Sequence, residues 1–368
     1  KLGARSGSSS RPRPAFFHRD GTTDRMADGP ARAVRDPGPL VGSPPVTDPA
    51  AEWRHVVERF LGFISGLRST SDELRDAQES VALVIANLRI HFRRADFLPI
   101  FKPPAEDAED HMVVGSYGKG TAIRHGRVVD VLYTASPETR SRIGGGRALT
   151  RELASALADQ FPGVDWADEG WISVKPGTPF TVRLLPTSPC RDGGFLIENQ
   201  AKATPRDLGA WRYIKPGVEA ARLAKADELS GNKATHLILM LKAWRRTHTL
   251  PIGAFALELL VTEFISVWNY YRRSLLFYDW MMRDFFFWLR YQGERQLAIP
   301  GTLHSLYLDS SWQTAAERAY RGAERASRLE RDNREGEALA EWRRIFGPAV
   351  GGAPALAAPA NPAIAAAS

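Results

Sequence analysis

The stretch VVGSYGKGTAIR at residues 113–124, followed by VVDVLY at residues 128–133, decides the fold of this chain. Apolar residues before a Gly-Ser pair predict a strand that ends in a tight turn at Gly115 and Ser116. The second apolar run predicts another strand, and it carries a single acid, Asp130. Because side chains alternate between the two faces of a strand, Asp130 is expected to face a cleft opposite the buried side.

The Gly-Ser turn has the composition of a loop that contacts phosphate groups. Glycine lets backbone N–H groups come close to an anion, and a hydroxyl adds a further donor. Ser116 supplies that hydroxyl, and Lys119 and Thr121 follow in the same loop. A Gly-Ser pair alone is a common turn, but the acid-bearing strand behind it favours a phosphate site. We therefore expect Gly115, Ser116, Lys119 and Thr121 to bind a phosphate-bearing ligand.

The acids needed for a divalent metal site are incomplete in this segment. Transfer of a phosphate-linked group commonly uses two divalent cations bridged by carboxylates, and Mg²⁺ or Mn²⁺ requires oxygen ligands. Val128 shares the face of Asp130 but is apolar, and the predicted strand FTVRLLP at 180–186 carries Arg183 at its centre. An arginine donates hydrogen bonds and does not ligate a cation. We expect Asp130 to be the catalytic, metal-binding acid, while Arg183 is either a surface residue or a partner of Asp130 or a phosphate.

The bulk composition bounds the class of protein. The chain has 368 residues, of which 43% are hydrophobic, enough for a core in two lobes. No apolar run reaches the length of a membrane span, and one cysteine, Cys190, excludes a disulfide framework within the chain. Of the net charge of +7, residues 1–47 hold +4, from eight basic and four acidic residues. The single cysteine fits the reducing cytoplasm. The body is only mildly basic, so it gives no strong nucleic-acid signal and favours a local phosphate pocket.

Composition and periodicity divide the chain into four regions. Residues 1–47 are rich in Pro, Gly, Ser and Arg and are predicted to be a disordered tail, with Met26 as a candidate natural start. Residues 48–215 are predicted to form a lobe with a mixed β-sheet and flanking helices, and residues 216–347 a helical lobe. Residues 348–368 are predicted to be a second disordered tail of Gly, Ala and Pro. The predicted fold class is therefore α+β, with a cleft between two lobes.

Hydrophobic spacing places the individual elements. The predicted helices cover residues 53–67, 74–92, 148–161, 232–247, 255–271, 278–291 and 312–346. The predicted N-cap region of the second helix is Ser71–Asp72. Further strands are predicted at residues 170–174, 180–185 and 194–197.

The chain resembles the bacterial cGAS/DncV-like nucleotidyltransferases, the CD-NTase family, over most of residues 50–347. The resemblance rests on GSYGKGTAIR at 115–124, VVDVLY at 128–133, FTVRLLP at 180–186, LMLKAWRR at 239–246, PIGAFALELL at 251–260, YDWMMRDFF at 278–286 and the charged segment at 311–347. It implies a two-lobed nucleotidyltransferase fold. It also implies an activity in which Mg²⁺ or Mn²⁺ supports the joining of NTPs into cyclic di- or trinucleotides, signals that switch on an effector in antiphage defence.

The resemblance implies roles for individual residues. Ser116 matches the phosphate-contacting serine, and Asp130 matches the second metal-binding acid. Lys242 matches the lysine that grips the triphosphate. Phe255 stands where an aromatic ring stacks on a nucleobase, with Ala254 in place of the usual preceding serine.

Val128 and Arg183 stand where the first and third acids of the family belong, and three hypotheses remain open. The first is a synthase with NTP substrates, impaired transfer and a regulatory or effector protein as partner. The second is an inactive module that binds a nucleotide or signal and acts through partner contacts, with Arg183 taking over the charge of the metal. The third is a decayed copy that keeps the fold without a role.

Overall fold

The computed structural model describes residues 54–95, 110–144, 146–166, 170–198, 211–272 and 277–351. All described residues lie in one compact unit of the chain. The predicted tail at residues 1–47 lies outside the described residues, as do residues 352–368 of the predicted C-terminal tail.

Helices dominate the described part of the chain, and strands are concentrated in its first half. The helices are α2 (Arg54–Leu67), α3 (Ser71–Ala95), α4 (Gly115–Gly118), α5 (Pro137–Ile143), α6 (Arg147–Ala158), α7 (Pro216–Ser230), α8 (Lys233–Thr247), α9 (Ala254–Val267), α10 (Tyr278–Leu289), α11 (Gln313–Arg331) and α12 (Glu335–Phe346). The strands are β1 (His111–Val114), β2 (Val128–Thr134), β3 (Asp165–Trp166), β4 (Ile172–Val174), β5 (Thr181–Pro189), β6 (Phe195–Glu198), β7 (Trp211–Ile214), β8 (Arg295–Ala298) and β9 (Ser305–Leu308). None of these helices is both long and apolar enough to cross a membrane.

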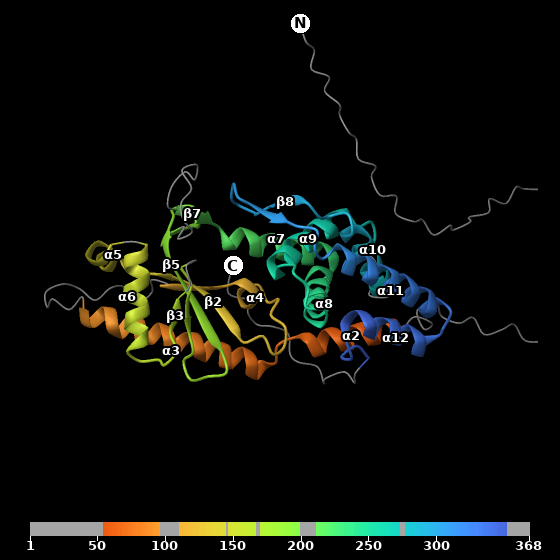
Figure 1. Cartoon of the computed structure of the whole chain (residues 1–368), viewed down its shortest axis with the longest axis horizontal. Helices are drawn as coiled ribbons and strands as arrows, with labels where there is room; N and C mark the ends of the chain where they lie inside the picture. The colour runs from red at the N-terminus through yellow and green to blue at the C-terminus, as the bar shows by residue number, and fades with distance from the viewer. Residues whose placement is uncertain are drawn as a thin grey trace, which may run out of the picture. The chain divides into compact units, whose positions relative to one another are not determined.

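The strands before residue 215 form a mixed sheet with β2 and β5 side by side at its centre (Figure 1). The order across the sheet is β1-β2-β5-β4-β3, and β6 and β7 continue from the end of β5. Strands β2 and β5 run parallel, whereas β1–β2, β4–β5 and β3–β4 are antiparallel. A parallel pair needs a crossover connection, which α5, α6 and the β3–β4 hairpin supply here. The predicted α+β fold with a mixed sheet followed by a helical block is confirmed.

The alternation of side chains along β2 separates a buried face of the sheet from an open one. Val129, Val131 and Tyr133 are buried in a core that includes apolar residues of α3 and α6. Asp130 lies on the opposite face, as the period of two requires. Leu132 shares that face and is buried in a small separate cluster. The two helices therefore cover one side of the sheet and leave the acid on the other.

The start of α3 is held by a reciprocal cap. The backbone N–H of Glu73 donates to Thr70 Oγ1 at 3.1 Å, and the N–H of Thr70 donates to Glu73 Oε2 at 3.1 Å. This is a capping box, in which two free N–H groups at a helix start are satisfied by side chains. The predicted N-cap region at Ser71–Asp72 is therefore wrong by a residue. Glu73 also pairs with Arg127 at 3.4 Å, which ties α3 to the loop that leads into β2.

The helices after residue 215 enclose the larger core, and α2 belongs to it. Val56, Phe60 and Phe63 of α2 are fully or almost fully buried there, although α2 precedes the sheet in the sequence. Figure 1 shows α2 beside α12, away from the strands. Val350 is buried in the same core, so the packed structure includes a residue of the predicted C-terminal tail. The lobe boundary predicted at residue 215 stays a prediction. Helix α2 precedes this boundary in the sequence, yet it packs in the core of the helices that follow it.

The prediction of one long helix at residues 312–346 is wrong. Helix α11 ends at Arg331 and α12 begins at Glu335. Asn333 between them has a φ of 54°, a left-handed conformation that asparagine adopts more readily than most residues. The charged pattern continues across this turn, so it hides the break. The helix predicted to reach residue 271 also ends earlier, at Val267.

Several elements were not predicted. The structure adds α5, the two-residue strand β3, the strand β7, the helix α7 and the β8–β9 hairpin. Most of these are too short to give a clear hydrophobic period. Their stability comes from tertiary contacts, which a local pattern does not contain.

Asp279, at the start of α10, is a buried acid in the helical core. Asp279 is only 1% exposed. Burial raises the pKa of this carboxyl to about 7, because the charged form loses its water. An acid whose pKa is higher in the folded state destabilises the fold at pH values above its unfolded pKa.

We expect Asp279→Asn to increase the free energy of unfolding by about 1–3 kcal/mol near pH 8, and by less near pH 5. The gain shrinks because the wild-type carboxyl is largely protonated in the folded state at the lower pH. Urea unfolding at both pH values measures the difference. Asp332→Asn, at the exposed end of α11, is the control and should show no such pH dependence. An equal effect of Asp279→Asn at both pH values would contradict the argument.

Candidate functional site

Asp130 and Arg183 form an ion pair on the open face of the sheet. The parallel register of β2 and β5 places the two residues directly opposite each other. Arg183 donates through Nε to Asp130 Oδ1 at 2.7 Å, and its Nη2 lies 2.5 Å from the same oxygen. Of the two interpretations open for Arg183, the structure therefore has the one in which it pairs with Asp130.

The guanidinium of Arg183 also rests on an aromatic ring. Its Cζ lies 5.0 Å from the centroid of Trp171, which precedes β4. Stacking on a ring face and pairing with a carboxylate fix the group from two sides. The arginine side chain is nevertheless 41% exposed, whereas that of Asp130 is 22% exposed. Burial raises the pKa of Asp130 more than the attraction of Arg183 and Lys119 lowers it.

The Gly-Ser loop lies against the carboxylate of Asp130. Gly115 has a φ of 64°, and a Cβ built at this position would lie 2.7 Å from Asp130 Oδ2. Gly118 is equally constrained, since a Cβ there would lie 2.3 Å from the carbonyl oxygen of Val113. At both positions a side chain would collide with a neighbouring atom, so glycine is required. The loop itself forms the short helix α4. The predicted neighbourhood of Gly115, Ser116 and Asp130 is present in the structure.

Lys242 on α8 joins the helical lobe to this loop. Its Nζ lies 2.8 Å from Ser116 Oγ, 2.9 Å from both the carbonyl oxygen and Oγ1 of Thr121, and 2.7 Å from Glu258 Oε1. An ammonium group has three protons to donate, so these acceptors use its full capacity. The lysine side chain is 6% exposed. Lys242 therefore holds the loop in place from its buried side.

Glu258 on α9 is the acid at the centre of this network. Lys119 Nζ lies 2.6 Å from Glu258 Oε2, and the Thr121 hydroxyl donates to Glu258 Oε1 at 2.7 Å. Burial alone would raise the pKa of Glu258, but Lys242 and Lys119 together hold it below its ordinary value. Glu219 on α7 lies 3.5 Å from Lys119 Nζ, and burial raises its pKa. Three residues of the loop are thus bound to the helical lobe through charges and hydroxyls.

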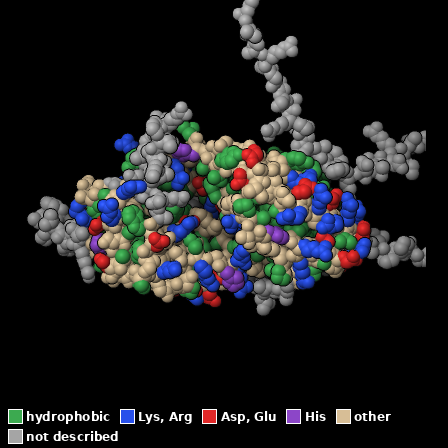
Figure 2. Space-filling model, in the orientation of Figure 1, with side chains coloured by type: hydrophobic (Ala, Val, Ile, Leu, Met, Phe, Trp, Pro, Cys, Tyr) green, Lys and Arg blue, Asp and Glu red, His purple; other side chains and the backbone are tan. Residues whose placement is uncertain are grey.

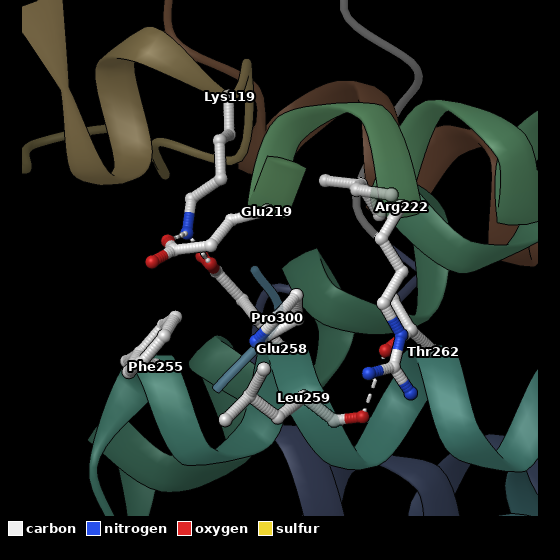
Figure 3. Close-up of a pocket in the computed structure, with 9 residues that line it drawn as sticks. Lys119, Glu219, Arg222, Phe255, Glu258, Leu259, Thr262 and Pro300 are labelled. Atoms are coloured by element: carbon white, nitrogen blue, oxygen red, sulfur yellow. Dashed lines mark hydrogen bonds and ion pairs between the residues drawn. The ribbon is translucent and has the colours of Figure 1, made fainter. Parts of the chain in front are cut away.

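Phe255 and Lys119 meet at a small pocket beyond the loop (Figure 3). Lys119 Nζ lies 4.9 Å from the centroid of the Phe255 ring, which is within the range of a cation–π contact. Figure 3 shows Lys119 reaching down toward Glu219 and Glu258, with the ring of Phe255 on one side and Arg222 on the other. The pocket is lined by Lys119, Glu219, Arg222, Leu223, Phe255, Glu258, Leu259, Thr262 and Pro300. Figure 2 shows the surface hollowed between the sheet and the helical lobe, with charged side chains around the hollow.

The side chains around Asp130 do not fit a pair of divalent cations. Asp130 Oδ1 already accepts from Arg183, and Val128 on the same face is apolar and 45% exposed. A guanidinium beside the carboxylate repels a cation and offers it no lone pair. Within the described residues, no group of three or more His, Cys, Asp or Glu side chains has the arrangement of a metal site.

Sequence patterns did not identify every residue of this site. Glu258 and Glu219 were missed, and so were Trp171 and Arg222. Glu258 had a usable signal, because it is the lone charge in the apolar run AFALELLV at 254–261. A charged residue within such a run is rarely buried unless it is paired. Glu219, Trp171 and Arg222 lie in segments where no residue differs from its neighbours in this way.

We expect Gly115→Ala to destabilise the fold more than Gly177→Ala. Both glycines have a positive φ, but only the Cβ at Gly115 meets another atom within 4 Å. The left-handed conformation costs each variant about 1 kcal/mol, and the contact with Asp130 adds to this cost at Gly115. Thermal unfolding of the two variants measures the difference. Equal losses would show that the loop does not press on the carboxylate.

We expect Glu258→Gln to lower the free energy of unfolding by about 3 kcal/mol, because two buried ammonium groups lose their shared carboxylate. Glu263→Gln is the matched control on the same helix. Glu263 pairs with Arg295, and both side chains are partly exposed, at 27% and 32%. A partly exposed pair contributes less than about 1 kcal/mol. Urea unfolding distinguishes the two variants, and losses of similar size would argue against a buried charge network.

Comparisons with known proteins establish the fold. No family model and no curated protein matches the sequence. Among solved structures, CdnC of E. coli MS115-1 in complex with HORMA-deltaN has a TM-score of 0.53 at 16% identity, covering 81% of this chain and 98% of that one. The Vibrio cholerae DncV cyclic AMP-GMP synthase, in complex with a linear intermediate, has a TM-score of 0.51 at 15% identity, covering 82% and 87%. The STING-associated CdnE c-di-GMP synthase of Capnocytophaga granulosa has a TM-score of 0.50 at 11% identity, covering 77% and 84%. The chain therefore has the two-lobed fold of the cGAS/DncV-like nucleotidyltransferases.

Proposed function

We propose that this chain binds a nucleotide in the hollow between its sheet and its helical lobe, and that nucleotidyl transfer is impaired there. The observation that carries the proposal is the ion pair of Arg183 with Asp130, at the place where the resemblance implies metal-binding acids. The proposal assigns the chain to nucleotide recognition, with its output through contacts with a protein partner.

The impairment follows from the shortage of oxygen atoms that could bind a metal ion. Two-metal transfer depends on carboxylates that share the cations and hold the attacking and leaving oxygens. Here Val128 offers no oxygen, and Arg183 occupies one oxygen of the remaining carboxylate. Removal of a preorganised electrostatic group in an active site typically slows a reaction by about a hundredfold or more. Two such losses support a protein with little or no turnover.

Nucleotide binding is supported by what remains of the site. The Gly-Ser loop keeps its close-packed glycines, and Ser116 lies at its surface beside Lys242. We assign phosphate contacts to Gly115, Ser116 and Lys119, and a nucleobase contact to Phe255. Lys119 holds Glu219 at 3.5 Å, its longer ion pair, which a phosphate oxygen would replace most easily.

Lys242 and Thr121 take a different part in this proposal. Both are buried and already bound to each other and to Glu258. They position the loop from behind and do not have to contact the ligand. Lys242 would reach a phosphate only by giving up one of its present acceptors.

A slow synthase is the second candidate, and the fold similarity favours it. Two of the structural neighbours are cyclic dinucleotide synthases by name, and they cover most of this chain. In this candidate Asp130 holds Mg²⁺ or Mn²⁺, NTPs are the substrates, and the product serves antiphage defence through an effector. It requires Arg183 to leave Asp130 before a metal binds.

We expect the purified chain to form no product above background from labelled ATP, GTP, CTP and UTP with Mg²⁺ or Mn²⁺. The double variant Val128→Asp/Arg183→Asp should form phosphatase-resistant products, because it supplies carboxylates at the two positions where the resemblance implies acids. The control Val128→Asn/Arg183→Asn has the same shape without the charge and should stay inactive. Thin-layer chromatography of the products measures the rates.

Product from the wild-type chain that is lost in Asp130→Asn would establish the slow synthase and refute a function through nucleotide binding alone. A doubly acidic variant that folds and binds ATP but forms nothing would show that residues 128 and 183 do not face the reacting phosphates. In that case the loss of the acids would not explain the inactivity.

A further inference from the structure

Arg183 is a preorganised cation whose hydrogen-bond donors, among the described residues, are engaged only along the edge formed by Nε and Nη2. Its Nε and Nη2 edge contacts Asp130 Oδ1, and its plane lies on Trp171. A guanidinium has five N–H donors in a fixed planar arrangement. The Nη1 side therefore points away from the carboxylate, and the side chain as a whole is 41% exposed.

This cation lies next to the loop that the proposed function assigns to phosphate. Asp130 links the two, since its Oδ1 accepts from Arg183 while its Oδ2 lies against Gly115. Lys119 is also near enough to lower the pKa of Asp130. A phosphate beside Gly115 and Ser116 would thus meet positive charge from Arg183 on the sheet and from Lys119 on the loop.

We propose that Arg183 is a phosphate-binding residue that replaces the divalent cations of the fold, so that the site takes nucleotide phosphates without any metal. This inference rests on the proposed function and names how that site recognises its ligand. The carboxylate of Asp130 has the role of aiming the guanidinium, in place of ligating a cation. Trp171 has the role of holding its plane.

The charges around the site indicate which phosphates suit it. Lys119, Lys242 and Arg183 are balanced by Asp130, Glu219 and Glu258, since each lysine or arginine has an acid partner in contact. Arg222 adds a positive charge at the pocket. A site of small net charge favours a ligand with few phosphate charges over a triphosphate without its metal. A cyclic dinucleotide, with its two phosphodiesters, belongs to this class, and ATP serves as the highly charged comparison.

The test is isothermal titration calorimetry of the full chain with cyclic diadenylate and with ATP, each in EDTA and in excess Mg²⁺. We expect cyclic diadenylate to bind with the same Kd in both buffers. We expect Arg183→Met to weaken this binding about tenfold or more, and Arg183→Lys to fall between, because lysine keeps the charge and loses the fork. Arg75→Met is the matched control. Arg75 is 61% exposed on α3, which covers the opposite face of the sheet, so its loss should leave the Kd unchanged.

Asp130→Asn separates this proposal from a metal site. The variant keeps an acceptor oxygen that aims the guanidinium and removes a competing negative charge, so we expect it to bind the nucleotide at least as tightly as the wild-type chain. A metal site would lose its ligand and its affinity with the same change. A second comparison, of Asp130→Asn with Asp130→Asn/Arg183→Met, repeats the test of the arginine. Neither variant has an unpaired carboxylate at residue 130, so the comparison stays valid if Arg183→Met alone unfolds.

Three results would overturn the inference. They are binding that requires Mg²⁺, loss of binding in Asp130→Asn, and unchanged binding after removal of Arg183 from a folded chain. Each of these leaves nucleotide binding itself intact. If neither nucleotide binds the wild-type chain in either buffer, the proposed function fails and the inference fails with it.

Discussion

The burial of Glu258 between the ammonium groups of Lys119 and Lys242 is the constraint on which the geometry of the cleft depends. Charges taken out of water are tolerated only when their partners are held at short distance. Lys119 belongs to the Gly-Ser loop, whereas Lys242 and Glu258 come from neighbouring helices of the other lobe. The charge requirement of the helical lobe therefore fixes where the loop lies. The position of the loop in turn fixes where Asp130 can lie, because Gly115 touches its carboxylate.

Beside this fixed loop, the sheet carries the pair Arg183 and Asp130 where the resemblance implies metal-binding acids. The parallel register of β2 and β5 places residues 130 and 183 side by side whatever their side chains are. With acids at such positions, a cation must enter from solvent to relieve their repulsion. With an acid and an arginine, the positive charge is part of the chain and is always present. The architecture is the same in both cases, and under our proposal the side chains at positions 128 and 183 decide whether the bound cation is a metal or a guanidinium.

Much of the fold and part of the site could be predicted from the sequence. The period of two along β2 was sufficient to assign Asp130 and Val129 to opposite faces, because that alternation is a local property. The break at Asn333 was not predictable in this way, since the charge pattern of the long segment continues through the turn. Glu258 was missed for another reason. The apolar run around Glu258 signals that its charge needs a partner, but that local pattern does not contain the partners, Lys119 and Lys242, which meet it only in the folded chain.

The place of α2 has a consequence for how the chain is made. One of its two arginines, Arg59, pairs with Glu330, which lies 271 residues further along the sequence. Phe60 and Phe63 likewise pack against helices that follow the sheet. During synthesis on the ribosome, which proceeds from the N-terminus, these apolar side chains emerge long before their partners and remain uncovered while the sheet forms. The sheet lobe can condense while the chain is still growing, but the helical lobe closes last, when α2 packs against helices from the end of the chain.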